Sequence, residues 1–226
     1  YRPDGRSGLN LDLRPARSRN VELGLKWRLR DGLRADLALF RSDTRDELVV
    51  ATNAGGRASF ANAGRSLRQG IEVELEAALG EAMTLQFAWT GLDASVRETY
   101  LACAGAPCTV PTQAIARGTR LAGVPRSMGR LRWDGRRGDW RAFSELRHVS
   151  AVTVNDAASD TAAGYALFDL GLSRGLRDGG QVFVRLDNAF DRRHVGSVIV
   201  NDGNGRFYEP GSGRTLWLGV DVRWQR

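Results

Sequence analysis

The sequence lacks the long apolar run that a membrane-spanning helix needs. Nowhere do about 18 apolar residues follow one another. The mean hydropathy of the 226 residues is −0.34, although 42% of them are hydrophobic. No membrane helix is therefore predicted. A barrel of transmembrane strands stays open, because alternating strands average to the hydropathy of a soluble protein.

Histidine is scarce as well, and this limits the chemistry. His148 and His194 are the only two histidines, and neither has a nucleophile at a motif spacing. Gly203 and Gly205 precede no predicted helix, so they do not form a phosphate-binding loop. We therefore predict that the protein is not an enzyme and that it has no catalytic residues, no metal site and no resident cofactor.

Cysteine is limited to one pair, Cys103 and Cys108. With nothing else nearby to complete a metal site, the pair indicates a small disulfide formed in an oxidising compartment. Two free thiols are the alternative. The chain opens Tyr-Arg-Pro-Asp-Gly without a signal peptide, so we expect a mature product or a fragment.

Lysine is almost absent, because Lys26 is the only one among 33 cationic side chains and all others are arginine. The net charge of +7 suits nucleic acid, anionic lipid headgroups or acidic ligands. A nucleic-acid-binding sheet would interleave aromatic residues with arginine on one exposed face. Here most of the aromatic residues lie on the same strand face as Leu and Val, so we expect no nucleic-acid binding.

What the sequence has in abundance is period-two alternation, which is clearest near the C-terminus. Thr215, Trp217, Gly219 and Asp221 alternate there with apolar residues, and this pattern is typical of a β-strand with one apolar face. Such a strand suits a soluble sandwich or the closing strand of a barrel in lipid. In a barrel, the lipid-facing residues would be Leu216, Leu218, Val220, Val222 and Trp224.

The same alternation recurs through the chain and predicts an all-β antiparallel fold of about nine strands. The predicted strands cover residues 21–29, 33–39, 71–79, 83–89, 128–133, a weaker segment from 140, 168–172, 182–186 and 215–224. Residues 44–60 form a longer loop in this interpretation, with room for extensions of the flanking strands.

The third predicted strand carries a ladder of three carboxylates on one face. Three successive charges against a dry core would each need a buried partner, whereas they suit a wet lumen where arginines from neighbouring strands pair with them. An acid/base or metal site is the less favoured interpretation of the ladder. The charged residues that we expect to face the lumen are Glu72, Glu74, Glu76, Arg130, Arg132 and Arg185.

The connections between the predicted strands alternate in length. Those near 30–32, 79–82, 134–139 and 176–180 are short, and those near 44–60, 98–120, 152–163 and 191–212 are long. A sandwich would scatter long loops over both ends, whereas a transmembrane barrel has short turns at one end and long loops at the other. With the C-terminus in the periplasm, all four long loops and the cysteine pair lie outside the cell.

The predicted number of strands, nine, is uneven, which is unusual for such a barrel. Single-chain bacterial barrels use even numbers, and open edges in lipid would leave unpaired backbone groups that each cost several kcal/mol. We therefore expect residues 1–226 to be one portion of a larger barrel.

Four segments carry a resemblance to a known family. The sequence resembles the TonB-dependent outer-membrane receptors, whose motifs appear here in family order. The matching segments are Leu13-Arg-Pro-Ala-Arg-Ser-Arg-Asn-Val-Glu-Leu-Gly24, Asn62-Ala-Gly-Arg-Ser-Leu-Arg-Gln-Gly-Ile-Glu-Val-Glu74, Leu121-Ala-Gly-Val-Pro125 and Leu186-Asp-Asn-Ala-Phe-Asp-Arg-Arg-His194. The sequence departs from the pattern at Ala16 (usually Glu), at His194 (usually Tyr), and at the end, where Gln225 and Arg226 follow the terminal aromatic Trp224.

The resemblance implies a 22-stranded barrel in the outer membrane, plugged by an N-terminal domain. This chain would be the C-terminal portion, without the plug domain and the TonB box. Such receptors bind a scarce small-molecule ligand outside and import it with energy from the TonB–ExbB–ExbD complex, which would contact the missing N-terminal part. The other implied partners are outer-membrane lipid, lipopolysaccharide and the barrel-assembly machinery.

The last long loop suggests the class of ligand. Residues 195–210 resemble a subgroup that includes receptors implicated in uptake of the redox cofactor PQQ, while other members are siderophore receptors. Arg206, Phe207, Tyr208 and Glu209 would stack on and pair with an anionic aromatic ligand, or else serve loop packing. The transported ligand would be an iron chelate or PQQ. A passive porin and an outer-membrane enzyme are the alternatives, but a porin would lack these motifs and an enzyme would need a catalytic set that is not found.

Overall fold

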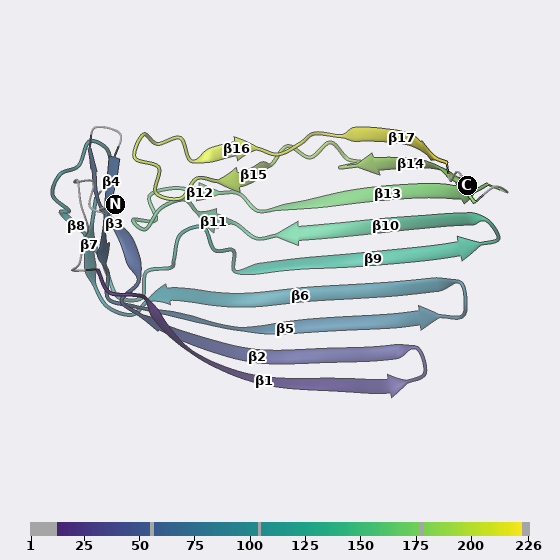
Figure 1. The fold of residues 1–226 in the computed structure, drawn as a ribbon, viewed down its shortest axis with the longest axis horizontal. Coiled ribbons are helices and arrows are strands. Elements are labelled where there is room, and N and C mark those ends of the chain that lie inside the picture. Colours follow the sequence, from purple (N-terminus) through teal and green to yellow (C-terminus); the bar gives the residue numbers. More distant parts are fainter. Residues whose placement is uncertain (1–12, 55–56, 104, 177–178, 223–226) are drawn as a thin grey trace.

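The structure is a computed structural model of the chain, and it describes residues 13–54, 57–103, 105–176 and 179–222. A nine-stranded antiparallel sheet dominates it, with the strands adjacent in chain order (Figure 1). These strands are β1 (Arg17–Arg30), β2 (Leu33–Arg45), β5 (Arg65–Leu79), β6 (Met83–Val96), β9 (Ser127–Arg137), β10 (Trp140–Val149), β13 (Tyr165–Gly175), β14 (Gln181–Asp187) and β17 (Thr215–Asp221). The predicted all-β fold with nine main strands is confirmed.

The two ends of the sheet differ, as the lengths of the connections predict. At one end, which we call the turn end, tight connections place Gly32, Gly80 and Gly138 at positive φ (77°, 73° and 57°), a conformation that glycine adopts without steric cost. At the other end, the loop end, each long connection contains a small hairpin (Figure 1). The hairpins are β3 (Leu48–Ala54) with β4 (Arg57–Asn62), β7 (Tyr100–Ala102) with β8 (Gln113–Ile115), β11 (Val152–Thr153) with β12 (Thr161–Ala162), and β15 (Val195–Val198) with β16 (Tyr208–Pro210).

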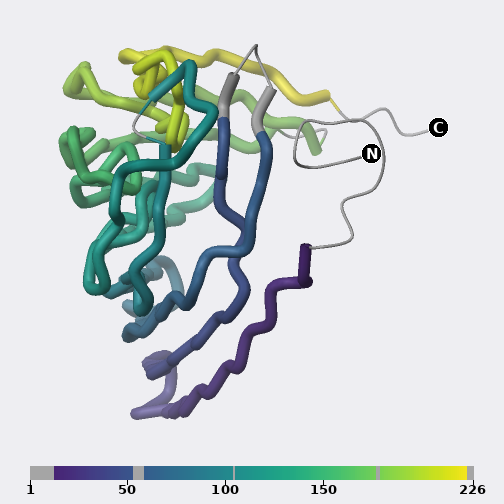
Figure 2. Tube along the Cα trace, turned by 90° about the vertical axis from the view of Figure 1, so that its left-hand side faces the viewer, coloured from purple at the N-terminus to yellow at the C-terminus, as the bar shows by residue number. Residues whose placement is uncertain are grey.

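The sheet is strongly curved. Seen along the strands, it forms an open arc with β1 and β17 at its two edges (Figure 2). The β3–β4 hairpin stands across the loop end of this arc (Figures 1 and 2). No helix in the described part of the chain is long and apolar enough to cross a membrane.

The strand register sorts the side chains onto two faces. One row of directly opposed residues is Leu25, Leu37, Val73, Trp89 and Gly129, and the next is Lys26, Asp36, Glu74, Ala88 and Arg130. We call the first the apolar face and the second the polar face. The open hollows of the sheet, such as those beside Asp36, Asp134 and Arg185, are lined mainly by polar-face residues, so the polar face is the concave one.

The apolar rows have the height of a membrane. On β5 they run from Ile71 to Leu79, roughly 26 Å along the strand, or about 20 Å of height at a strand tilt of about 40°. A transmembrane barrel has an apolar band of about 25 Å. The apolar side chains of this band remain open, as in Leu23 (72% exposed) and Leu218 (74% exposed).

Several strands are longer than their alternation predicts, mostly toward the loop end, although β9 continues instead to Arg137 at the turn end. β5 begins at Arg65, in a segment with polar residues on both faces and no period of two. β6 continues to Val96, in a segment where Asp93 and Ser95 take the positions that are apolar lower in the strand. The last strand is instead shorter, since β17 ends at Asp221 and Val222 follows it. Trp224 lies outside the described residues.

Aromatic side chains cover glycines on neighbouring positions of the sheet. A Cβ added to Gly171 would lie 2.1 Å from the Phe143 ring, and one added to Gly219 would lie 2.3 Å from the Phe183 ring. Both glycines are directly opposite these aromatic residues across a strand pair. Such pairing lets a ring lie flat against the backbone, which explains why phenylalanine occurs on the polar face.

Candidate functional site

An ion-pair network covers the polar face of β9, β10 and β13. Glu145, only 14% exposed, accepts hydrogen bonds from Arg130 Nε (2.7 Å) and Arg132 Nη1 (3.3 Å). Arg132 also binds both oxygens of Asp134, each at 2.7 Å, and its guanidinium stacks 4.3 Å from the centre of the Phe143 ring. Bidentate and stacked contacts of this kind hold an arginine in one orientation.

The network continues to the most buried carboxylate of the wall. Arg147 lies 3.5 Å from Glu145 and donates to Asp169 at 2.6 Å. Asp169 is 2% exposed, and its second oxygen accepts the backbone N–H of Asn188 at 2.8 Å. Burying a carboxylate without such partners is costly. Asp169 therefore joins the barrel wall to the chain that leaves β14.

Asn188 fastens the base of the last long loop. Its side chain accepts the N–H of Arg192 and donates to the carbonyl oxygens of Arg192 and Ser212, so that it closes both ends of the loop together. Its φ of 48° lies in the left-handed region, which asparagine tolerates better than most residues. The loop over residues 192–212 thus starts from a fixed base.

A smaller polar cluster lies near the closing strand. Arg185 Nε pairs with Asp187 at 2.5 Å, and the indole N–H of Trp217 donates to the other oxygen of Asp187 at 3.0 Å. Arg185, Trp217 and Asp187 are all on the polar face. The sequence placed Arg185 on this face, and the structure adds the aromatic residue beside it.

The carboxylate ladder of β5 has a different environment. Glu72, Glu74 and Glu76 lie exposed on the polar face. Their opposite neighbours are Ala38, Asp36 and Arg34 on β2, and Thr90, Ala88 and Gln86 on β6. Among the residues that the structure describes, none forms an ion pair with the ladder within 4.0 Å. The predicted pairing with neighbouring arginines is therefore not found. Glu72 and Glu74 instead line an open groove of about 540 Å³ together with Glu22, Lys26 and Asp36.

The hairpins at the loop end pack into a closed layer. Val96, Ala102 and Ile115 form a small buried cluster beside Tyr100, Leu121 and Ala157. A cavity of about 50 Å³ remains between the loops, lined by Asp156, Asn201 and Phe207 among others. That volume holds about one or two water molecules, so this cavity is too small for a larger molecule.

A polar cluster ties the third long loop to the fourth. Asp156 and Asn201 exchange two hydrogen bonds of 2.9 Å, one from the Asp156 N–H and one from the Asn201 amide. Tyr100 lies beside them, and its burial, together with the Asp156 carboxylate, raises the pKa of the phenol well above its ordinary value.

The four predicted ligand-binding residues lie together in the last loop, in different roles. The Tyr208 hydroxyl donates to Asp160, and this bond lowers the pKa of Asp160 and raises that of Tyr208. Phe207 lines the small cavity and meets the Tyr208 ring edge-on at 6.3 Å. The side chains of Arg206 and Glu209 are exposed. The two charged side chains are thus open, Phe207 is half-buried, and Tyr208 is both exposed and held by its hydrogen bond to Asp160.

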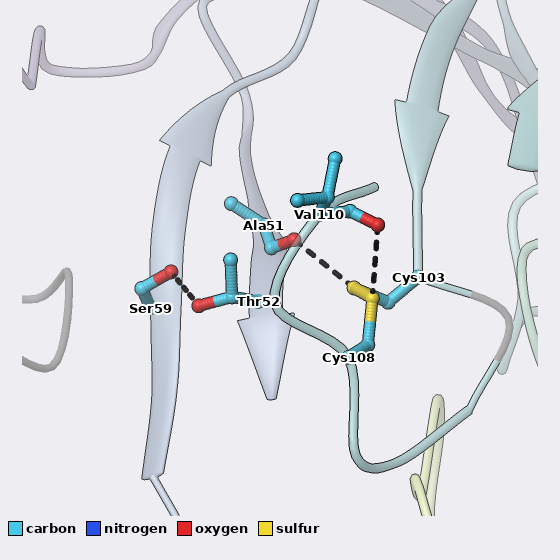
Figure 3. The surroundings of a disulfide bond; sticks show 6 residues. All are labelled: Ala51, Thr52, Ser59, Cys103, Cys108 and Val110. Carbon is cyan, nitrogen blue, oxygen red and sulfur yellow. Dashed lines mark hydrogen bonds between the residues drawn. A yellow bond between two sulfur atoms is a disulfide. The ribbon is translucent and has the colours of Figure 1, made fainter. Parts of the chain in front are cut away.

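Cys103 and Cys108 are joined by a disulfide at the loop end (Figure 3). The Sγ of Cys103 lies 3.2 Å from the carbonyl oxygen of Ala51 on β3, and the N–H of Ala106 donates to Gly203 O at 2.9 Å. The short disulfide loop therefore touches both the first and the fourth long connection.

Sequence reasoning missed the centre of the polar network, which consists of Glu145, Arg147, Asp169 and Asn188. The alternation of β10 is weak because Ser144 and His148 lie on its apolar face, and this hid Glu145 and Arg147. Asp169 follows Phe168 and precedes Leu170, where a single charge in an apolar segment was the available signal. Among the described residues, no group of three or more His, Cys, Asp and Glu is placed to hold a metal ion.

Comparison with known proteins places this wall in a family. A family model described as "TonB dependent receptor-like, beta-barrel" matches residues 1–189. The chain belongs to this family. The family resides in the outer membrane, where a β-barrel turns an apolar face to lipid and a polar face to its lumen. The resemblance in the sequence motifs is confirmed.

Solved structures of receptors and transporters share the fold. The siderophore receptor PiuA from Acinetobacter baumannii superposes with a TM-score of 0.73 at 20% identity, over 91% of this chain and 28% of that one. The ferric-catecholate import receptor Fiu from E. coli K12 gives 0.70 at 20% identity, over 98% and 30%. The copper transporter OprC gives 0.70 at 18% identity, over 93% and 31%. This chain thus spans less than a third of each, and at these identities the likeness shows the fold alone.

Proposed function

We propose that this chain is the C-terminal wall of an outer-membrane importer that takes up a scarce ligand with energy relayed by TonB. Family membership is the observation that carries the proposal. In this proposal the loop end faces the outside of the cell and the turn end faces the periplasm. A plug domain in the missing N-terminal part fills the lumen and contacts the TonB–ExbB–ExbD complex.

The construction of the loop end supports a role in ligand capture. The base of the last loop is fixed through Asn188 and Asp169, and the loop presents the exposed side chains of Arg206, between its two strands, and of Glu209 on β16. Fixed loops with a few open charged groups bind ligands at a lower ordering cost. We propose that Arg206 and Glu209 contact the ligand, while Phe207 and Tyr208 shape the surface beneath it.

The ligand that we propose is an anionic metal chelate of the ferric siderophore type, or PQQ. Some structural neighbours are described as siderophore receptors and one as a copper transporter. Arginine at the loop tip suits carboxylate or catecholate oxygens, because guanidinium groups bind such oxygens with two parallel hydrogen bonds.

The test is ligand uptake by cells that carry the full-length receptor, with and without functional TonB. A ferric siderophore and PQQ are offered in parallel. Uptake of one that depends on TonB is the expected result. Uptake of a compound that survives the loss of TonB would instead indicate a passive channel.

A matched pair of variants localises the site. Arg206→Ala should raise the concentration needed for half-maximal uptake. Arg193→Ala, which removes an exposed arginine from the same loop, should leave uptake unchanged. Equal effects of the two variants would contradict a role for the loop tip.

A further inference from the structure

A six-residue ring in the second long connection lies against the loop that carries the proposed ligand-binding residues. The disulfide between Cys103 and Cys108 closes this ring, which we call the disulfide ring. Residues of the ring line a cavity of about 50 Å³ together with Asp202, Gly203 and Phe207 of the last long loop. The ring and the last loop are far apart in the sequence, so it is the fold that brings them together.

Residues 201–206 of the last loop form a compact turn, which we call the Arg206 turn. The Asp202 carboxylate accepts the backbone N–H of Asn204 at 3.2 Å and that of Arg206 at 2.7 Å. The N–H of Gly205 donates to Asp202 O at 3.2 Å. Asp202 thus ties the backbone of Arg206 to the start of the turn, while the Arg206 side chain stays exposed. The place from which that side chain extends therefore depends on how the whole turn is held.

Two neighbouring connections hold the Arg206 turn from outside. From the third connection, Asp156 exchanges two hydrogen bonds of 2.9 Å with Asn201. From the second connection, the N–H of Ala106 in the disulfide ring donates to Gly203 O at 2.9 Å. The first attachment holds the start of the turn, and the second holds its middle. Of these two attachments, the one that the disulfide ring supplies is closer in sequence to Arg206.

The disulfide ring is itself well anchored, so it can hold another loop. The Sγ of Cys103 lies 3.2 Å from the carbonyl oxygen of Ala51 on β3, which seats the ring against the first connection (Figure 3). Ala102, directly before the ring, is buried. Without the closing bond, these six residues would have many conformations in which the Ala106 N–H points elsewhere, and losing them costs free energy. The disulfide removes most of these conformations before a ligand arrives.

We propose that the disulfide ring positions the Arg206 turn and thereby raises the affinity of the receptor for its anionic ligand. This rests on the proposed function, in which Arg206 contacts that ligand. Two parallel hydrogen bonds from a guanidinium to carboxylate or catecholate oxygens require one orientation of the group, and a group that is already held in place binds at a lower ordering cost. Cys103 and Cys108 are positioning residues that act through Arg206.

The first test needs no ligand. Hydrogen exchange over residues 201–207 is measured on the purified full-length receptor in lipid, with and without the change Cys103→Ser/Cys108→Ser. Exchange there should become about fivefold faster, as expected for the loss of one hydrogen bond. The control Thr99→Val removes a hydroxyl that accepts the N–H of Arg117 at 3.2 Å in the same long connection, and it should leave this exchange unchanged. Unchanged exchange in the cysteine variant, or an equal change in the control, would overturn the proposal.

The second test measures uptake by cells that carry the full-length receptor, with a ferric catecholate siderophore and PQQ as probes. For the probe that is taken up, Cys103→Ser/Cys108→Ser should raise the concentration for half-maximal uptake about fivefold and leave the maximal rate unchanged, whereas general damage to the barrel would lower the maximal rate. In receptors that carry Arg206→Ala, the cysteine change should have no further effect, because both changes act through one side chain.

Two results of the uptake test would overturn the proposal. One is an unchanged half-maximal concentration in the cysteine variant, and the other is a full additional loss in receptors that carry Arg206→Ala. Uptake of neither probe by the unchanged receptor would instead contradict the ligand class of the proposed function. Hydrogen exchange would then still decide whether the disulfide ring holds the Arg206 turn.

Discussion

On the closing strand β17, two neighbouring side chains show how the faces of the sheet differ. Leu218 (74% exposed) and Trp217 (53% exposed) both lie open in this chain. Trp217 has a polar partner in Asp187, whereas Leu218 has only Val184 opposite it. One face therefore satisfies its side chains with hydrogen bonds and the other offers only apolar groups. In a transmembrane barrel, a wall of this kind separates lipid from a wet lumen.

The lumen wall itself has two unlike halves. On β9, β10 and β13 the charges of Arg132, Glu145 and Asp169 are paired and partly buried. On β5 the ladder of Glu72, Glu74 and Glu76 is exposed, and Glu74 stands opposite another carboxylate, Asp36. Paired buried charges cost stability when broken, whereas open charges contribute little. The two halves should therefore respond differently to the loss of a carboxylate.

The largest effect should come from a charge on the lipid face. Leu218→Arg should lower the free energy of unfolding in lipid by about 2–4 kcal/mol. Thr215→Arg, on the lumen face of the same strand, should cost far less because water can hydrate the new charge. Unfolding by denaturant in lipid vesicles measures both. Equal costs would show that the two faces are assigned wrongly.

The next effect concerns the paired half of the lumen. Asp169→Ala leaves Arg147 without its closest carboxylate and the Asn188 N–H without an acceptor, at a cost of about 2 kcal/mol. The base of the last loop should also loosen. Hydrogen exchange over residues 188–212 measures this loosening. Unchanged protection there would show that Asp169 does not stabilise the loop.

A smaller effect is expected at the Tyr208–Asp160 bond. The pKa of Asp160 is lowered from 3.8, so its contribution is complete above pH 3.8 and is lost as the pH falls through the lowered value. The pKa of Tyr208 is raised from 10.0, so its contribution is complete below pH 10.0 and is lost as the pH rises through the raised value. Loop protection in hydrogen exchange should therefore be constant between these limits. Tyr208→Phe should lower it evenly across that window, and a dependence on pH near neutrality would contradict this.

The smallest effect should occur in the unpaired half. Glu74→Gln removes one of two facing carboxylates and breaks no ion pair with any residue in the described segments, so stability should change by less than about 0.5 kcal/mol. Its matched comparison is Asp169→Ala, because both changes remove one lumen carboxylate. A loss at Glu74 as large as at Asp169 would reveal a partner for the ladder.

The alternation of side chains was enough to predict the barrel wall. The apolar rows that end at Leu79, Met83 and Val182 identified the strands. Side chains alternate along these strands because one face meets lipid and the other meets water. Above the apolar rows this contrast is lost on β5 and inverted on β6, where Asp93 and Ser95 take apolar-face positions, so these loop-end parts were not predicted. Hairpins such as β11–β12 have only two residues in each strand, too few for a period to show.

The polar site was harder to predict than the wall. The alternation of side chains along each strand predicted that Arg130, Arg132 and Arg185 lie on one face. It did not predict which carboxylates they bind. A carboxylate of the ladder, such as Glu72, was the expected partner of these arginines. The strand order instead brings Glu145 beside Arg130. Partners on different strands depend on register, which a single sequence does not reveal.

The measurement that tests the two-faced wall most directly is a spin-label scan along β5. Single labels replace residues 71 to 77 in the full-length receptor in lipid, and collisions with oxygen and with a water-soluble nickel complex are recorded. The collision rate with oxygen should be highest at the odd-numbered positions, such as Val73 and Leu75. The collision rate with the nickel complex should be highest at Glu72, Glu74 and Glu76. Accessibilities that rise and fall together, or that show no period of two, would contradict a wall between lipid and lumen.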